Sequence, residues 1–269
     1  AFRRRTGKEP ILIAGVTGGP RQAAWEARKA RDLGYHACLL HFGGMRDASR
    51  GELLDCCREV AEILPLIGFY LQCAVGGRIL TYGFWVRFLE IERVVAVKVA
   101  PFDRYKTLDV VRAIGISGRE REVALYTGND DAFVTDLLTE FPVGHAQIRF
   151  SGGLLGQWAV WTKKAVELLE RIKQARDREP ASIPALLAEG ARLTDANGAI
   201  FDAANGFAGC IPGIHEVLRR QGLLEGVWCL DPAETLSRWQ AEEIERVCSS
   251  YPELADDEFV EQHRDAWLA

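Results

Sequence analysis

The chain has 269 residues, of which 48% are hydrophobic and 26% are charged, and this is an ordinary globular composition. The formal net charge of −5 argues against a general nucleic-acid binder, which usually carries a basic face. No apolar run approaches the roughly 18 residues that a membrane helix needs, and the basic segment 1–10 lacks the apolar core of a signal peptide.

Short apolar runs that are typical of strands alternate with longer segments whose apolar residues recur at helical spacing. The six strand-like runs cover residues 11–18, 36–42, 67–72, 94–100, 122–128 and 147–152. Their apolar residues are continuous rather than alternating, which indicates a parallel sheet buried on both faces. Because a helical pattern follows each run, the sequence predicts an α/β protein with six consecutive βα units.

The strand signals stop after about residue 180. Segments 182–205, 212–222 and 232–249 have helical patterns, and we expect the acidic stretch 253–261 to be a solvated tail. The one plausible linker, residues 175–184, is short and polar. We therefore predict a barrel portion with six βα units over residues 1–180 and a C-terminal helical region over residues 181–269 that packs on the barrel.

Cysteine and histidine usage gives no sign of a metal. The seven cysteines are scattered and form no Cys-x-x-Cys pair, which predicts reduced thiols, a cytoplasmic protein and no zinc site. His41 and His215 are single histidines without a matching set of partners. A Gly-x-Ser-x-Gly motif is also absent, which weakens an α/β-hydrolase interpretation.

Lys98 stands in the apolar run VVAVKVA, near the end of the fourth predicted strand. An apolar setting disfavours the ammonium form of a lysine, and a neutral amine can attack a carbonyl group to form a Schiff base. The alternative is a structural lysine that reaches the solvated rim or pairs with a carboxylate such as Asp103.

Tyr70 lies on the preceding predicted strand, in IGFYLQ. A phenol near a Schiff-base lysine can relay protons to and from the substrate. The alternative is a core aromatic residue whose hydroxyl group is hydrogen-bonded locally.

Two further strand ends carry polar or small residues. Asn129 and Asp130 in TGNDD either cap the following helix or face a substrate. Gly152 and Gly153 in SGGLLG allow backbone amides to approach an anion or a carbonyl group, although a glycine-rich turn alone is weak evidence.

Taken together, Tyr70 in GFYLQ and Lys98 in VVAVK, 28 residues apart, resemble the dihydrodipicolinate synthase / N-acetylneuraminate lyase superfamily of class I aldolase-type (β/α)8 barrels. The family pattern has a glycine seven residues after the tyrosine, which is Gly77 here. ALYTGNDD, FSGGLLG and the stretch NGFAGCIPGIHEVLRRQGLLEG also resemble family segments. The resemblance extends from about residue 11 to residue 225.

The resemblance implies a (β/α)8 TIM barrel that lacks its first two βα units in this chain and ends in a C-terminal helical cap. The implied function is a divergent Schiff-base lyase or aldolase that acts on a 2-oxo acid or sugar acid and has seven expected site residues. Lys98 would attack the carbonyl and Tyr70 would shuttle the proton, while the remaining positions would orient the substrate: Gly77, Asn129, Asp130, Gly152 and Gly153. No metal or organic cofactor is expected, because the lysine is the electron sink. The family implies a homo-oligomer, a dimer or tetramer.

The sequence also departs from the family pattern. Leu71, Gln72 and Cys73 replace the usual Asn-x-Pro, Val75 replaces an arginine that helps to bind an acidic substrate, and Arg78 is nearby but not equivalent. The alternatives are therefore a catalytically degenerate barrel that binds a ligand or partner without turnover, or a dehydratase that uses the same lysine.

An eight-stranded barrel also needs two more units, which in the family carry a loop that grips the substrate's carboxylate. We expect these units in an N-terminal segment that precedes the chain shown. The alternatives are a second chain that completes the barrel, or an open six-stranded sheet with exposed strand edges.

Overall fold

The computed structural model describes residues 2–269, without the side chains of residues 2 and 3. The chain forms two compact units, the first made of residues up to 126 and 140–151, the second of residues 127–139 and 152–269. This division does not follow the predicted boundary between residues 180 and 181. The reason is that helices on both sides of that boundary pack on one another within unit 2.

Six strands form one sheet in the order β1-β2-β3-β4-β5-β8, and the first four pair in parallel. This agrees with the predicted α/β class and with each of the six strand-like runs. The strands are β1 (Ile13–Val16), β2 (Ala37–Leu40), β3 (Leu66–Leu71), β4 (Val94–Ala100), β5 (Ala124–Thr127) and β8 (Phe150–Gly153).

A short antiparallel hairpin, β6 (Phe141–Val143) and β7 (Ala146–Ile148), precedes the last strand and was not predicted. Its first strand has three residues and contains Pro142, so it gives no strand signal in the sequence. The tight turn is made by Gly144, whose φ of +59° favours glycine.

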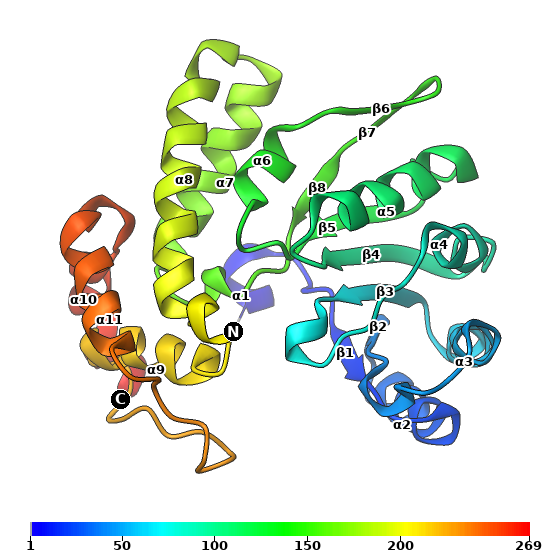
Figure 1. Ribbon diagram of the computed structural model, residues 1–269, viewed down its shortest axis with the longest axis horizontal. Helices are drawn as coiled ribbons and strands as arrows, with labels where there is room; N and C mark the ends of the chain where they lie inside the picture. The colour runs from blue at the N-terminus through cyan, green and yellow to red at the C-terminus, as the bar shows by residue number, and fades with distance from the viewer. Residues whose placement is uncertain (1) are drawn as a thin grey trace. The chain divides into compact units, whose positions relative to one another are not determined.

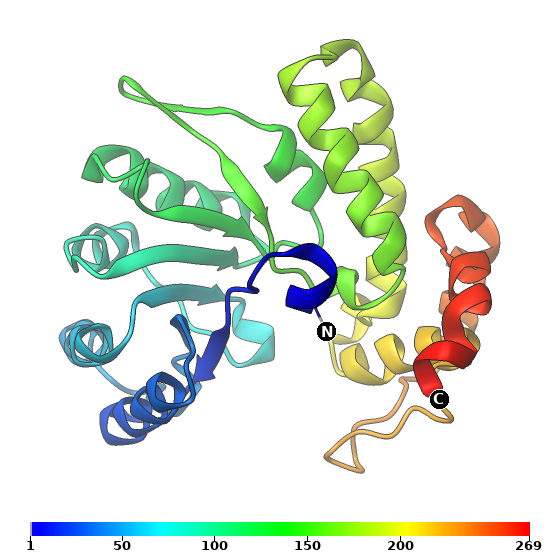
Figure 2. The same ribbon diagram turned by 180° about the vertical axis from the view of Figure 1, so that it is seen from behind.

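The helices of unit 1 are α1 (Phe2–Thr6), α2 (Pro20–Asp32), α3 (Arg50–Ile63), α4 (Tyr82–Phe88) and α5 (Arg104–Ser117). Figure 1 shows α2 to α5 side by side along one face of strands β1 to β4, and Figure 2 shows the same layer from behind. Capping residues in the sequence fix the starts of two of these helices, α3 and α5. Ser49 and Glu52 form a capping box at the start of α3, and the Asp103 side chain accepts a hydrogen bond from the backbone N–H of Lys106 in α5.

The two faces of the sheet have different surroundings, because successive side chains in a strand point to opposite faces. The outer face packs under α2 to α5, and it is buried at Tyr70, Val97 and Val99. The opposite face, here called the inner face, carries a buried cluster with partly buried neighbours. The cluster is Ala37, Ile67 and Ala96, and its neighbours are Leu39, Ala124 and Tyr126.

Arg119, just after α5, holds the segment that leads into β4. Its guanidinium group donates hydrogen bonds to four backbone carbonyls, those of Leu89 (2.7 Å), Ile91 (2.9 Å), Glu92 (2.7 Å) and Val94 (2.9 Å). One side chain thus binds four carbonyl groups of this segment, and it fixes the start of the strand that carries Lys98.

We expect Arg119→Met to lower the free energy of unfolding by about 2–3 kcal/mol, because three half-buried carbonyl groups and one exposed carbonyl group lose charge-assisted donors. Urea denaturation measures the change. The matched control is Arg121→Met, two residues further on and exposed, which should change stability by less than about 0.5 kcal/mol. Equal effects of the two substitutions would contradict the role of Arg119.

Unit 2 contains α6 (Phe133–Leu138), α7 (Thr162–Asp177), α8 (Ile183–Ile200), α9 (Cys210–Arg220), α10 (Gln240–Ser250) and α11 (Asp257–Leu268). The predicted helical patterns at 182–205 and 212–222 correspond to α8 and α9, whereas the one at 232–249 becomes a helix only from Gln240. The expected solvated tail at 253–261 is wrong, because Leu254 and Val260 are buried and α11 begins at Asp257. None of the helices within residues 2–269 is both long and apolar enough to cross a bilayer.

Candidate active site

Lys98 lies on the inner face, near the carboxyl end of β4. It pairs in register with Phe69 of β3, and its Nζ lies 4.5 Å from the centroid of the Phe69 ring. That distance is typical of a cation–π contact. The amine is thus half-buried against an aromatic ring, at the end of the sheet where α/β proteins bind their ligands.

Asp103, the carboxylate that the sequence suggested as a structural partner for Lys98, has other contacts. It pairs with the Lys106 ammonium group at 3.1 Å and caps α5. The hydrogen bonds from Lys106 lower the pKa of Asp103, which keeps this carboxylate ionised at the helix terminus. Its position therefore follows from helix capping.

Tyr70 lies on the opposite face of the sheet from Lys98. It pairs in register with Val99, its ring packs 5.3 Å from the Trp85 ring of α4, and only 1% of its surface is exposed. Its hydroxyl oxygen accepts a hydrogen bond from the Leu80 N–H, and burial raises the pKa of Tyr70 to about 12. The structure thus places Tyr70 in the core between the sheet and α4, and the proton relay by Tyr70 stays a prediction.

We expect Tyr70→Phe to lower the free energy of unfolding by about 1 kcal/mol, through the loss of one buried hydrogen bond at 3.3 Å. Chemistry at Lys98 should be unchanged. Urea denaturation measures the first effect, and the rate of imine trapping with a 2-oxo acid measures the second. A tenfold slower trapping rate in this variant would show that the Tyr70 hydroxyl takes part in the chemistry at Lys98.

Gly77 is needed for a steric reason. Its N–H donates to the carbonyl oxygen of Gln72 at 2.9 Å, so the amide that the sequence assigned to substrate is used within the loop. A Cβ atom at this position would lie 2.0 Å from the carbonyl oxygen of Leu71, which only glycine avoids. The backbone must fold back on itself here to connect β3 to α4.

Arg78 also has a structural role. Its guanidinium group donates to the carbonyl oxygens of Met45 (2.6 Å) and Ala48 (2.9 Å). Arg78 therefore ties the loop after β3 to the loop after β2, and both loops follow the carboxyl ends of strands that form the inner face.

Two side chains that the sequence analysis did not select share the inner face with Lys98. His41 follows β2, and its ring centroid lies 6.0 Å from that of Phe69. Tyr126 of β5 packs on the cluster that contains Ala96, two residues before Lys98. The sequence contains a signal for His41, since Leu39 and His41 are two residues apart in a strand-like run and must point to the same face.

In unit 2, Asn129 belongs to a buried hydrogen-bond network. Its side-chain amide donates to the Asp136 carboxylate at 2.9 Å, and the Thr127 hydroxyl donates to the same oxygen at 2.6 Å. Neither Asn129 nor Asp130 caps α6, whose N-cap is Ala132.

Asp130 anchors the loop before α7. Its carboxylate accepts hydrogen bonds from the backbone N–H groups of Gln157 (2.8 Å) and Gly156 (3.4 Å), and its carbonyl oxygen accepts one from the Asn197 side chain at 2.8 Å. These contacts show how the residue shapes unit 2. A substrate-orienting role for Asn129 and Asp130 stays a prediction.

Gly152 and Gly153 are buried at the end of β8. A Cβ atom at Gly153 would lie 2.7 Å from the Leu155 side chain and 2.9 Å from that of Trp158, so close packing requires this glycine. The predicted approach of their amides to a substrate is likewise still a prediction.

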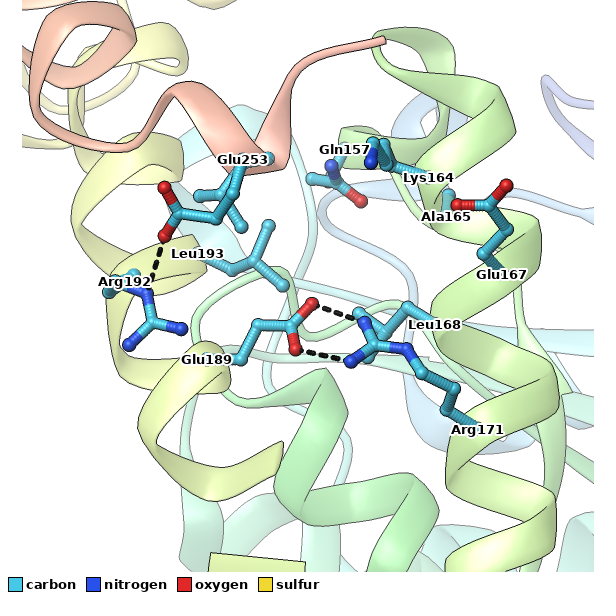
Figure 3. Close-up of a pocket in the computed structure, with 11 residues that line it drawn as sticks. Gln157, Lys164, Ala165, Glu167, Leu168, Arg171, Glu189, Arg192, Leu193 and Glu253 are labelled. Carbon is cyan, nitrogen blue, oxygen red and sulfur yellow. Dashed lines mark hydrogen bonds and ion pairs between the residues drawn. The ribbon is translucent and has the colours of Figure 1, made fainter. Parts of the chain in front are cut away.

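Unit 2 also contains a polar cavity of about 290 Å³ between α7, α8 and the turn at residues 252–254. Figure 3 shows Arg171 and Glu189 facing each other across it in a two-pronged ion pair, and Arg192 beside Glu253 at 3.0 Å. None of the seven sequence-predicted site residues lines this cavity. We therefore keep the inner face around Lys98 as the candidate active site.

The fold and the inner-face lysine together define a class, an α/β protein built from the consecutive βα units of a (β/α)8 barrel. No family model and no curated protein sequence matches the chain. Solved structures do match, and they place the fold among dihydrodipicolinate synthases and N-acetylneuraminate lyases, so the resemblance seen in the sequence is confirmed at the level of the fold.

Three of these structures illustrate the likeness. A chloride-inhibited dihydrodipicolinate synthase from Acinetobacter baumannii, complexed with pyruvate, is 21% identical with a TM-score of 0.70 over 92% of this chain and 77% of its own. A prophage protein of the dihydrodipicolinic acid synthase family from E. coli, also in complex with pyruvate, is 15% identical with a TM-score of 0.70 over 94% of this chain and 78% of its own. The N-acetylneuraminate lyase from Fusobacterium nucleatum is 16% identical with a TM-score of 0.66 over 93% and 77%.

Proposed function

We propose that this protein is a Schiff-base-forming lyase or aldolase that acts on a 2-oxo acid or a related sugar acid, with Lys98 as the nucleophile. The observation that carries the proposal is the position of Lys98, half-buried on the Phe69 ring at the carboxyl end of β4. Two structures with this fold were determined with pyruvate, which is a 2-oxo acid whose C2 carbonyl a lysine could attack.

In this mechanism the neutral Lys98 amine attacks the C2 carbonyl of the substrate, and loss of water from the carbinolamine leaves an iminium ion. The iminium group then accepts the electron pair of a bond broken at C3–C4. The Phe69 ring favours the positive charge of the iminium ion, because the face of an aromatic ring carries negative potential. Tyr126 of β5 also packs against the cluster on this face, so a phenol lies on the same face as the amine.

The test is to trap the imine. The protein is incubated with pyruvate and sodium borohydride, and the modified peptide is located by mass spectrometry. A reduced adduct on Lys98 is the expected result. An adduct on another lysine would overturn the assignment of Lys98, and product analysis of longer substrates would then separate a lyase from a dehydratase.

A second candidate function is a barrel that binds a ligand without turnover. Two observations favour it: Tyr70 is in the core, and the Gly77 amide is used within its own loop. Pyruvate or another 2-oxo acid that binds, as measured by calorimetry, but leaves no adduct after borohydride would favour this candidate. The predicted dimer or tetramer is a separate question, which light scattering of the purified protein answers.

A further inference from the structure

His41 occupies a defined place relative to Lys98 on the inner face. The strand order β2-β3-β4 puts Phe69 between them, with the Lys98 Nζ 4.5 Å and the His41 ring centroid 6.0 Å from the Phe69 centroid. The amine and the imidazole therefore lie no further apart than the sum of these two distances. A substrate attached to Lys98 that extends over Phe69 brings its third and fourth carbon atoms toward His41.

One ring nitrogen of His41 makes no hydrogen bond to the described residues. Its Nε2 is buried and has no hydrogen-bond partner among residues 2–269. The crevice that it lines with Phe69, Leu71 and Gly77 has a volume of about 10 Å³, room for one water molecule at most. A Cβ atom at Gly43 would lie 2.4 Å from the imidazole, so the chain has a glycine where the ring needs the space.

We propose that His41 is the proton-transfer residue of this site, which removes a proton from the C4 hydroxyl or the C3 carbon of a substrate held on Lys98. This inference rests on the proposed function. It assigns to His41 the task that the sequence analysis assigned to Tyr70, whose hydroxyl lies on the other face of the sheet.

The steps balance without any other reactant. In cleavage, neutral His41 takes the C4 hydroxyl proton, the C3–C4 bond breaks to release an aldehyde, and its electron pair moves to form the enamine on Lys98. The His41 imidazolium then returns a proton to C3, which regenerates the iminium ion, and water releases the 2-oxo acid. With pyruvate alone, the same residue removes and returns a C3 proton.

The surroundings of His41 favour the neutral base. Burial lowers its pKa below the ordinary value of 6.5. Charged side chains near His41 include Lys98, whose Nζ contacts the same Phe69 ring, Arg78, which lines the same crevice, and Glu26 of α2. Glu26 accepts a hydrogen bond from the N–H of Thr17, whose hydroxyl bonds the His41 carbonyl oxygen.

The test separates imine formation from proton transfer. Exchange of the pyruvate methyl protons for deuterium is followed by NMR in D₂O, and the imine is trapped in parallel with borohydride. We expect His41→Gln to form the Lys98 adduct as the wild type does and to exchange at least about 100-fold more slowly. The matched control is His145→Gln in the exposed β6–β7 turn, which should leave both readouts unchanged.

Exchange in His41→Gln within threefold of the wild-type rate would overturn the role of His41 while leaving Lys98 in place. If the wild type forms no adduct, the proposed function fails first, and the role of His41 fails with it. Should His41→Gln not fold, the pH profile of the folded wild type decides. Exchange should hold its rate at neutral pH and decline only below pH 6.5, and a decline centred above that value would contradict a neutral, buried base.

Discussion

Replacing Lys98 with arginine should reduce turnover of a 2-oxo acid by about 10³-fold or more and abolish the borohydride adduct. The guanidinium group stays protonated at every accessible pH, so it offers no lone pair to a carbonyl carbon. Arginine can place its guanidinium group over the Phe69 ring, where the protonated form of Lys98 lies before it reacts. The free energy of unfolding should therefore change by less than about 1 kcal/mol, as measured by urea denaturation.

Lys106→Arg is the matched control for this substitution. Lys106 lies in the same unit, at the start of α5, and its ammonium group pairs with Asp103 at 3.1 Å. Arginine can make the same ion pair, so turnover and trapping should equal those of the wild type. Turnover in Lys98→Arg above a tenth of the wild-type rate would show that another group is the nucleophile.

The strands could be predicted from the sequence because a parallel sheet covered by helices needs continuous apolar runs. Residues 94–100 and 67–72 show this directly, and they form β4 and β3 almost as expected. The β6–β7 hairpin could not be predicted, since its strands have three residues each and are too short to show an alternating pattern. The start of α10 at Gln240 could not be predicted either. In the sequence, the acidic residues near position 256 mask the apolar pattern of Leu254 and Val260. Both side chains are buried and anchor the last helix.

The position of Lys98 at a strand end could also be predicted, but its neighbours could not. The 28-residue spacing from Tyr70 says nothing about which face of the sheet each side chain takes. That depends on the register between β3 and β4, which shifts between Leu66 and Ile67. A register change of one residue moves every side chain of a strand to the other face, and no local pattern encodes it. Phe69, rather than Tyr70, is therefore the residue beside Lys98.

The buried network of unit 2 was likewise hidden in the sequence. Asn129 was selected as a helix cap or a substrate ligand, yet its partner is Asp136, inside the following helix. Fully buried carboxylates are rare, so a sequence gives no reason to place Asp136 in the core. Only the fold shows that the carboxylate accepts hydrogen bonds from two buried donors.

Replacing Asp136 with alanine should lower the free energy of unfolding by about 3–5 kcal/mol, the largest stability change that we expect from a single substitution in the TGNDD region. The side chain is 0% exposed and accepts hydrogen bonds from the Thr127 hydroxyl (2.6 Å) and the Asn129 amide (2.9 Å). Its removal leaves both donors buried without this partner. Urea denaturation measures the loss, and Thr135→Ala, an exposed threonine of the same helix, is the control with little expected effect.

A double-mutant cycle shows whether the hydrogen bond, rather than the lost volume, causes the effect. Thr127→Val alone should cost about 1–2 kcal/mol, since it also removes the acceptor for the Asn129 N–H. In the double variant no hydroxyl is left stranded, so Thr127→Val and Asp136→Ala together should cost less than the sum of the single changes. Strict additivity would mean that the Thr127 hydroxyl finds another partner when Asp136 is gone, and that the buried network is not what stabilises this part of unit 2.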